Sequence, residues 1–372
     1  MLHLVKSVSI DFIFQMTKNR RITFLFANFV DVGYIKSIGL TLDDILRDEL
    51  RTNLTMKDQS VSIKISLVLT IIMFVGGVIN SIFSLITFQN KQCQQVGCGL
   101  YLLASSITSF LSITMFTIKF WFVVLTQIDA STSLSVLQGG CVSMEVVLKF
   151  CLYFDGWLNA CVAIERATNV IKGVTFDKNK SRFYAKRTIL VLPFCIIGTL
   201  IHELLYRRLL VYPPKIDETN VGITERYILC VTRYTPAVQN YNTAILFLHL
   251  LAPFVINLCS ALVIVFGGAR QRSVARKDQS FKEHIREQFK EHKQLIISPI
   301  ILLVLSIPRV IISLLPDGVK ISENLWLYLS AYLISFIPPM LIFIIFVVPS
   351  KFYMKIFKLA FTCTRQRNPI HK

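Results

Sequence analysis

Charged residues are scarce in this chain, and the shortage excludes an ordinary soluble domain. Asp, Glu, Lys and Arg make up 17% of the 372 residues, whereas soluble domains average about 25%. Hydrophobic residues make up 53%, and they gather in runs of the roughly 20 residues that a helix needs to cross a bilayer. The composition therefore predicts an all-α membrane protein.

Acidic residues are especially few, since 22 Asp and Glu stand against 40 Lys and Arg. A net charge of +18 is also typical of nucleic-acid-binding proteins. Here, however, the basic residues lie between apolar runs, so no nucleic-acid partner is expected. Seven runs are predicted to span the membrane as a helix bundle: 65–88, 98–126, 141–165, 188–206, 243–266, 295–315 and 325–348.

The positions of the basic residues predict the orientation of the bundle. With the N-terminus outside, the inner segments hold 22 Lys and Arg and the outer loops hold 6. This excess follows the positive-inside rule, so we expect the N-terminus outside and the C-terminus inside. The inner segments are 89–97, 166–187, 269–293 and 350–372, and the outer loops are 127–140, 202–242 and 316–324.

The runs divide the chain into three parts. Residues 1–60 form an extracellular N-terminal segment, 61–349 form the seven-span domain, and 350–372 form an amphipathic helix and a cytoplasmic tail. The first 20 residues lack the basic start and apolar core of a signal peptide. Asn53 begins an Asn-Leu-Thr sequence before the first run, which is either a glycosylation site or a chance match.

The nine cysteines show no metal-ligand spacing, and no metal site is expected. Most lie inside apolar runs, where a free thiol acts as a small apolar side chain. Cys141, at the start of the third run, and Cys230, in the second outer loop, both lie on the oxidising side. A disulfide between them would tie this loop over the third helix. The alternative is two unpaired thiols.

A Glu165-Arg166 pair ends the third run. Arg166 follows Cys141 by 25 residues, about 37 Å of helix, so the two residues belong at opposite membrane surfaces. A buried Glu–Arg pair costs desolvation of both partners, and a position at the inner surface, with water nearby, lowers that cost. The simpler alternative is that Arg166 is one more basic flank of a span.

With seven predicted spans, the pattern of Cys141, Glu165-Arg166-Ala167 and Cys230 resembles the rhodopsin-like (class A) G-protein-coupled receptors. That family has Asp/Glu-Arg-Tyr at the inner end of its third helix. The resemblance covers residues 61–360. Asn80 resembles the asparagine of the family's first helix. Pro253, Pro308 and Pro338-Pro339 resemble the prolines of its fifth, sixth and seventh helices, and residues 349–361 resemble the short amphipathic helix that follows the seventh.

The resemblance implies a plasma-membrane receptor without enzymatic activity. It would bind an extracellular ligand and activate a heterotrimeric G protein, which Arg166 contacts after leaving its acidic neighbour Glu165. Glu287 or Glu291 would hold Arg166 in the resting state, and an agonist would shift the population towards an open inner cavity. Cys363 lies after the surface helix, beside the lipid bilayer, as a palmitoylation candidate or a plain free thiol.

The sequence departs from the family at several positions of the activation switch. The second run has Ile107 where the family has Asp. The sixth has Ser306 in place of Trp, and the seventh has Ile342 in place of Tyr. The family's detailed switch is therefore not carried over to this chain.

Asp155 lies in the middle of the third run, where a carboxylate is a candidate functional site. It shares one helix face with Asn159 and Arg166. We hypothesise that Asp155 replaces the missing carboxylate of the second helix, as a sodium or proton site with Asn159 near Asn80. The alternative is a neutral, hydrogen-bonded Asp that packs helices together. No other cofactor is expected.

Five ionisable residues are predicted in the outer halves of the spans, at the depth of the ligand pocket in the family: Lys119, Glu145, Lys149, His249 and Arg309. Such groups are costly in a bilayer unless they face one another or a wet cavity. Glu145 and Lys149 are four residues apart and can pair on one helix face. Because three are cations, we expect a peptide ligand or an acidic small molecule. The alternative for Lys119 is snorkelling to the outer surface.

Two other classes of protein are weighed against the receptor. A seven-span transporter or channel would be expected to show inverted repeats or broken helices, and no repeat is seen in the sequence. A seven-span hydrolase would need several His and carboxylate metal ligands inside the membrane, and only His249 lies well inside a run. A ligand-gated current would favour the first class, and a bound metal would favour the second.

Overall fold

A computed structural model describes residues 61–128, 133–212, 227–232, 234–275, 301, 304–305 and 325–366 of the chain. The long helices are α5 (Val61–Phe88), α6 (Gly97–Ile128), α7 (Leu134–Lys172), α8 (Lys178–Tyr206) and α9 (Pro236–Ala275). After them come α12 (Leu325–Ile334), α13 (Ile337–Met340), the π-helix η5 (Phe343–Val347) and α14 (Lys351–Gln366). The shorter elements are the 3-10 helices η2 (Cys93–Gln95) and η3 (Gly173–Thr175) and the strands β1 (Arg207–Tyr212) and β2 (Tyr227–Thr232).

Five of the described helices are long and apolar enough to cross a membrane. They match the first five predicted spans. The sixth run, 295–315, lies outside the described residues except at 301, 304 and 305. The seven-span count and the outward N-terminus therefore stay predictions.

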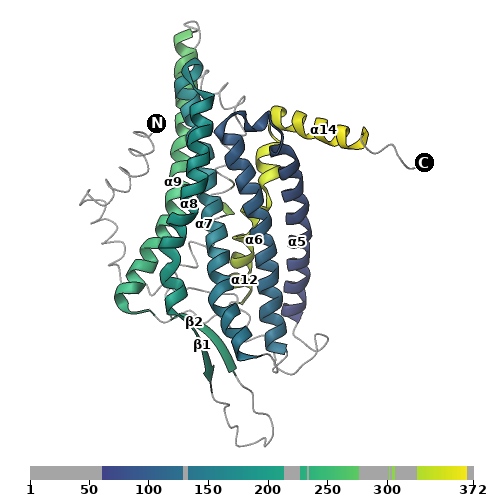
Figure 1. Ribbon diagram of the computed structural model, residues 1–372, viewed down its shortest axis with the longest axis vertical. Coiled ribbons are helices and arrows are strands. Elements are labelled where there is room, and N and C mark those ends of the chain that lie inside the picture. The colour runs from purple at the N-terminus through teal and green to yellow at the C-terminus, as the bar shows by residue number, and fades with distance from the viewer. Residues whose placement is uncertain are drawn as a thin grey trace, which may run out of the picture.

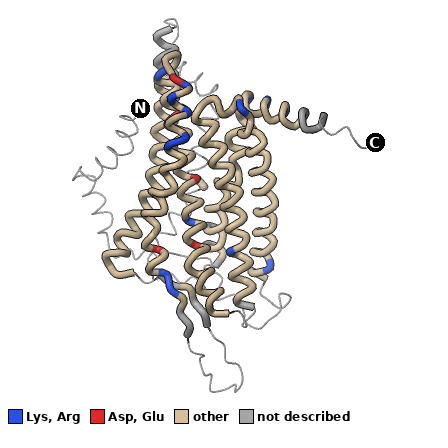
Figure 2. The backbone as a smooth tube through the Cα atoms, in the orientation of Figure 1, with Lys and Arg blue, Asp and Glu red and all other residues tan. Residues whose placement is uncertain are grey.

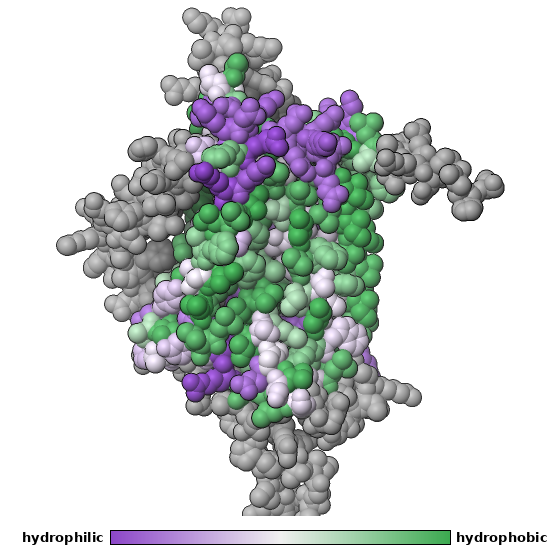
Figure 3. Space-filling view, viewed as in Figure 1, coloured by the Kyte–Doolittle hydropathy of each residue, from purple (hydrophilic) through white to green (hydrophobic). Residues whose placement is uncertain are grey.

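The burial pattern of α5 is the reverse of that in a soluble helix. Its buried face holds hydroxyl side chains, with Ser66 and Thr70 at 0% exposure, whereas Val68 and Ile72 are 53% and 62% exposed. Exposed apolar side chains are stable against lipid and costly in water. On the face of the molecule that Figure 3 shows, the described residues around the middle are mostly apolar, and hydrophilic residues gather towards the two ends.

The long helix α7 lies in the middle of the bundle and contacts α6, α8 and α9. Figure 1 shows the long helices running between two ends of the molecule. One end carries α14, which lies across the bundle axis, and the opposite end carries the β1–β2 hairpin. We call these the α14 end and the hairpin end. On the predicted topology they are the inner and the outer end.

The hairpin corrects the all-α prediction for the second outer loop. β1 and β2 pair antiparallel, with Arg207 opposite Thr232 and Leu209 opposite Cys230. Their sequences, RRLLVY and YILCVT, are rich in the β-branched and aromatic residues that favour strands.

The seventh predicted run is interrupted rather than continuous. α12 ends at Ile334, α13 begins at Ile337, and the backbone between them turns through N–H bonds from Ser335 to Tyr332 and from Phe336 to Leu333. Pro338 and Pro339 follow, and proline has no N–H to continue a helical ladder. The chain then passes through η5 into α14, where Tyr353 is buried against Phe88, with ring centroids 5.3 Å apart.

The start of α8 also differs from the sequence prediction, which began the fourth span at residue 188. The helix begins ten residues earlier, at Lys178, because Asp177 caps it. The Asp177 carboxylate accepts the backbone N–H groups of Asn179 and Lys180, and these bonds hold the pKa of Asp177 below its usual value. Basic residues gather where α8 begins and along α14, as Figure 2 shows.

Candidate functional site

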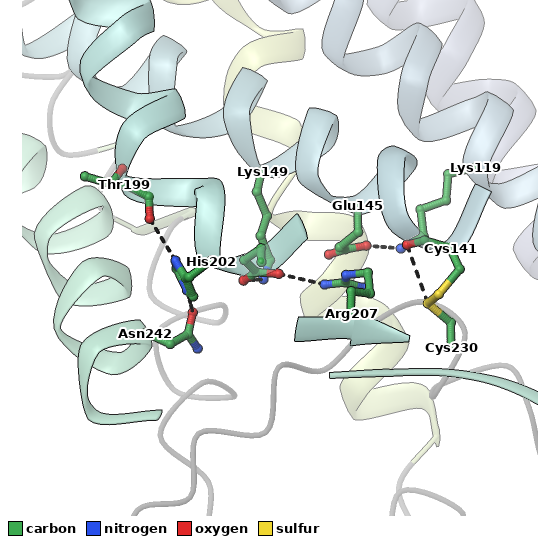
Figure 4. Close-up of polar contacts among 10 residues, drawn as sticks. Lys119, Cys141, Glu145, Lys149, Thr199, His202, Arg207, Cys230 and Asn242 are labelled. Carbon is green, nitrogen blue, oxygen red and sulfur yellow. Dashed lines mark hydrogen bonds and ion pairs between the residues drawn. A yellow bond between two sulfur atoms is a disulfide. The ribbon is translucent and has the colours of Figure 1, made fainter. Parts of the chain in front are cut away.

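A disulfide fixes the hairpin to the bundle. Cys141, which lies about two turns after the start of α7 at Leu134, and Cys230 on β2 are bonded, with their Cα atoms 5.6 Å apart. The pairing proposed from the sequence is therefore present, and the alternative of two unpaired thiols is not what the structure has. Because Cys230 lies opposite Leu209 in the sheet, the disulfide holds both strands over α7 (Figure 4).

Beside the disulfide, buried charges alternate in sign from α6 to β1. Lys119 on α6 is paired with Glu145 on α7, and Lys149 on α7 is paired with Glu203 on α8. Glu203 also accepts from Arg207, at 2.8 Å, where β1 begins. We call these five residues the charge ladder (Figure 4). It links three helices and the hairpin through side chains that are nearly excluded from water.

The ladder corrects two expectations for its members. The spacing of Glu145 and Lys149 allowed them to pair along one helix, but each forms an ion pair with a residue of a neighbouring helix. Lys119 was weighed as a snorkelling side chain, but it is 3% exposed. A buried charge that loses its partner costs roughly 3–5 kcal/mol, so these pairs strongly constrain how the helices are placed.

Two members of the ladder, Glu203 and Arg207, were missed in the sequence. They stand four residues apart at the outer end of α8, where charges look like an ordinary boundary between a span and a loop. Lys149 could have pointed to them, because a cation in the middle of an apolar helix needs an anionic partner. Glu145 was the only partner considered for Lys149, and the structure pairs Glu145 with Lys119. Contacts between distant segments decided the pairing, and hydropathy does not report them.

A small cavity opens next to the ladder. Lys119, Glu145, Cys141, Cys230 and Leu209 are among its lining residues, and its volume is about 30 Å³. That volume holds about two water molecules, far less than the roughly 300 Å³ of a typical small-molecule pocket. In this conformation the space between α6, α7 and the hairpin is therefore water-sized.

His249 does not belong to the ladder. Trp157 Nε1 donates to His249 Nδ1 at 2.9 Å, and His249 Nε2 lies 2.8 Å from Thr199 Oγ1. Tyr153 stacks on the ring at a centroid distance of 4.6 Å. Both ring nitrogens are therefore used in joining α7, α8 and α9, and neither is left for a ligand. Arg309, the fifth predicted pocket residue, lies outside the described residues.

Asp155 sits at the contact of α6 and α7 and is 3% exposed. Ser105 Oγ donates to one carboxylate oxygen, and Asn159 Nδ2 donates to the other at 3.1 Å. Asn159 Oδ1 is buried and has no hydrogen-bond partner among the described residues, and neither polar atom of Asn80 has one. The structure thus joins Asp155 to Asn159 but forms no bond from either to Asn80.

This oxygen set fits a hard cation or a proton better than a transition metal. The Asp155 carboxylate, Ser105 Oγ and the unpartnered Asn159 Oδ1 are all oxygen donors, which Na⁺-like and Ca²⁺-like ions prefer. No group of three or more His, Cys, Asp and Glu side chains in the described ranges is placed to hold a metal ion.

At the α14 end, the side chains of Glu165 and Arg166 contact different partners. Glu165 accepts from Ser181 Oγ on α8, and Ser181 Oγ itself accepts the backbone N–H of Gly97 at 2.9 Å. The backbone N–H groups of Cys98 and Gly97, at the start of α6, lie near the Glu165 carboxylate. A helix N-terminus favours an anion at this position. A Cβ on Gly97 would lie 2.5 Å from Glu165 Oε2, so only glycine fits there.

Arg166 instead packs against groups without charge. Its guanidinium lies 5.3 Å from the ring centroid of Phe346 in η5 and within hydrogen-bonding reach of the side chains of Cys98 and Tyr353. The predicted resting partners, Glu287 and Glu291, lie outside the described residues. Arg166 is therefore held at the start of α14 rather than by Glu165.

The two candidate modification sites have no described side chains. Asn53 lies outside the described residues, and Cys363 falls within α14 at a position whose side chain is not described.

No protein-family model matches the chain, and no curated protein is significantly similar to it in sequence. What bears on function is therefore the geometry of the charge ladder, of Asp155 and of Arg166.

Proposed function

We propose that the chain is a rhodopsin-like G-protein-coupled receptor of the plasma membrane with its N-terminus outside. It binds an extracellular peptide or acidic small molecule and activates a heterotrimeric G protein by contact, with no enzymatic activity of its own. One observation carries the proposal: the single helix α7 bears a disulfide-anchored hairpin at one end and the Glu165-Arg166 pair at the other.

The contacts of Arg166 support a role in switching. A cation over an aromatic ring contributes roughly 0.5–2 kcal/mol, and a hydrogen bond from a charged donor contributes roughly 1.5–3 kcal/mol. These contacts can break without leaving a buried anion unpaired, whereas Glu165 stays fixed to α6 and α8. An agonist that favours the state with Arg166 released from Phe346 and Tyr353 would shift the population towards a partner-binding form.

The same end of the bundle offers an apolar contact for a protein partner. Val174 lies just beyond α7 in η3 and is fully exposed. Val174 follows Arg166 by eight residues along the chain. We therefore place Arg166 and Val174 in the G-protein contact.

We further propose that Asp155 and Asn159 bind a sodium ion or a proton that stabilises the resting receptor. The unpartnered Asn159 Oδ1 beside the buried carboxylate supports this proposal. Asp155→Asn should remove any sodium dependence of ligand binding while the protein still folds, because the amide can keep the bond to Ser105. Ligand binding in the wild type that depends on neither sodium concentration nor pH would contradict it.

Nucleotide exchange tests the receptor proposal. Membranes holding the full chain are assayed with a panel of G-protein α subunits, with and without extracts enriched in small peptides. We expect stimulated exchange by the wild type and none by Arg166→Ala. Arg187→Ala is the matched control, because Arg187 is an exposed arginine at the same end that stacks on Phe183; it should retain exchange. Equal activity of Arg166→Ala would refute the role of Arg166.

A transporter or channel is the second candidate, and one observation favours it. Four buried hydroxyls on α5 and α6 have no partner among the described residues: Ser81, Ser84, Ser109 and Ser112. Waters could satisfy such groups and so form a polar track through the bundle. Ion or proton flux in proteoliposomes, lost in Ser109→Ala with Ser112→Ala, would support this function over the receptor.

A further inference from the structure

We propose that His202 and Asn242 form a proton-binding site that joins α8 to α9 at the hairpin end. The imidazole of His202 takes up a proton from acidic solution, and the side-chain amide of Asn242 turns to accept the new N–H group. The site itself does not depend on the proposed receptor function, whereas its use as an input to a receptor rests on that function.

His202 lies between two oxygen atoms. It is 6% exposed and lies about one turn before the end of α8. Its Nδ1 is 2.9 Å from the backbone oxygen of Thr199, and its Nε2 is 3.1 Å from Asn242 Oδ1 (Figure 4). A backbone carbonyl can only accept, so Nδ1 carries a hydrogen. With Oδ1 facing it, Nε2 also has to donate, and a ring that donates from both nitrogens is the charged imidazolium.

The amide of Asn242 accommodates the neutral ring as well. An asparagine side chain ends in an acceptor oxygen and a donor NH₂ group of nearly the same shape. A half-turn of the amide brings Nδ2 to the place of Oδ1, where it donates to a bare Nε2 of His202. Leaving a buried polar atom without a partner is costly, and this site avoids that cost in both protonation states.

His249, the other histidine in the described part of the chain, lacks this freedom. Trp157 Nε1 donates to its Nδ1 at 2.9 Å, so Nδ1 carries no hydrogen. A proton added there would set two N–H groups against each other, because the indole nitrogen of Trp157 is a donor only. Of these two buried histidines, His202 is therefore the one that can gain a proton without losing a hydrogen bond.

The rings around His202 are uncharged. Tyr241 of α9 meets the imidazole edge to face, with centroids 4.9 Å apart, and Tyr234, which precedes α9, lies at 5.9 Å. Aromatic rings at such distances can attract a cation. α9 itself has no Asp, Glu, Lys or Arg between residues 236 and 269, so it brings no charge that opposes an imidazolium.

The nearest charges along α8 belong to the charge ladder. Glu203 follows His202 directly and is paired with Lys149 of α7 and with Arg207. Its carboxylate favours a proton on His202, and the two cations oppose it. The ladder therefore supplies charge of both signs, and the contrast between Asn242 and Trp157 as partners distinguishes the two histidines.

Nuclear magnetic resonance of the histidine rings tests the site. The purified full chain in nanodiscs is labelled with ¹³C at histidine Cε1, and the signals that vanish in His202→Gln and in His249→Gln assign the two rings. Between about pH 8 and about pH 5, the range in which histidine serves as a switch, we expect the His202 signal to move to the imidazolium position. The His249 signal should stay at the neutral position. A His202 signal that does not move, or a His249 signal that moves with it, would overturn the proposal.

Variants of Asn242 test the partner. Asn242→Asp sets a carboxylate beside the ring, so His202 should bind its proton about tenfold more tightly or better. Asn242→Leu removes the acceptor and should weaken proton binding about threefold or more. Asn240→Asp and Asn240→Leu are the matched controls, because Asn240 is exposed two residues earlier on α9, and each should change proton binding less than about twofold. Unchanged proton binding in Asn242→Leu would refute the site.

Use of the proton by a receptor is read separately, from the pH dependence of nucleotide exchange in the wild type and in His202→Gln. Exchange that responds to acid in the wild type alone would make the proton an input to the receptor. No G protein enters the resonance experiment, so a failure of nucleotide exchange would count against the receptor and leave the proton site untouched.

Discussion

The two ends of α7 are held in opposite ways. At the hairpin end, charges are paired with charges across three helices and a covalent bond closes the arrangement. At the α14 end, the arginine is held by an aromatic ring and neutral side chains. Removing one partner of a buried ion pair costs roughly 3–5 kcal/mol, whereas a cation–π contact contributes roughly 0.5–2 kcal/mol. On the proposed function, the ion pairs of the hairpin end persist, and the contacts of Arg166 at the α14 end are the ones that break.

The largest effect is expected from Glu203→Gln, which breaks the hairpin end. Lys149 and Arg207 would both lose their buried carboxylate, so stability should fall by roughly 3–5 kcal/mol. The melting temperature of the purified protein in nanodiscs measures this loss of stability. Arg208→Gln alters a charge on the exposed neighbour and should change stability by less than about 0.5 kcal/mol. Equal effects of the two variants would mean that the ladder is not a stabilising unit.

Removing the disulfide is expected to have the next largest effect. Cys141→Ser with Cys230→Ser opens a link across 89 residues, and should cost about 2–4 kcal/mol. Unfolding of the double variant is compared with that of Cys195→Ser, which removes an exposed free thiol. Reducing agent should destabilise the wild type but not the double variant. A wild type indifferent to reduction would contradict the anchoring role.

Gly97→Ala tests the fixed part of the α14 end. The added Cβ would lie 2.5 Å from Glu165 Oε2, 2.8 Å from Ala185 Cβ and 2.9 Å from the Ser181 carbonyl oxygen. Overpacking of this kind costs roughly 1–3 kcal/mol. Gly198→Ala is the control, because nothing lies within 4 Å of its added Cβ. If both variants melt alike, Glu165 is not held against the start of α6.

Tyr353→Phe is expected to change stability the least of these variants. It should nevertheless change activity. It removes one hydroxyl near Arg166, while the contacts of the guanidinium with Phe346 and Cys98 remain. Because this contact favours the resting state, basal nucleotide exchange should rise about two- to fivefold. Tyr184→Phe, a second tyrosine near the same end, should leave basal exchange unchanged. A fall in exchange with Tyr353→Phe would mean that Tyr353 supports the active form.

Hydropathy alone predicted the five described spans, because the length and apolar character of each run are local properties of the sequence. The facing cysteines were also predictable, since topology places Cys141 and Cys230 on one side. The partners of Lys149 and Arg166 were not. Glu203 and Tyr353 stand 54 and 187 residues away along the chain, and only the packing of helices brings them together.

Local geometry accounts for the other differences from the sequence prediction. The hairpin was missed because its strands flank a loop in a chain otherwise read as helices. The break between α12 and α13 was marked by Pro338-Pro339, which was taken as a feature of a continuous span. The early start of α8 depends on one capping side chain, Asp177, among basic residues that resemble a loop.

The central claim, that Arg166 contacts a G protein, is tested most directly by complex formation. The purified full chain is mixed with each G-protein α subunit and its βγ partner, the nucleotide is removed enzymatically, and the mixture is separated by size. We predict a stable nucleotide-free complex for the wild type and for Arg187→Ala, and none for Arg166→Ala. A complex of equal yield with Arg166→Ala, or none between the folded wild type and any subunit, would contradict the account.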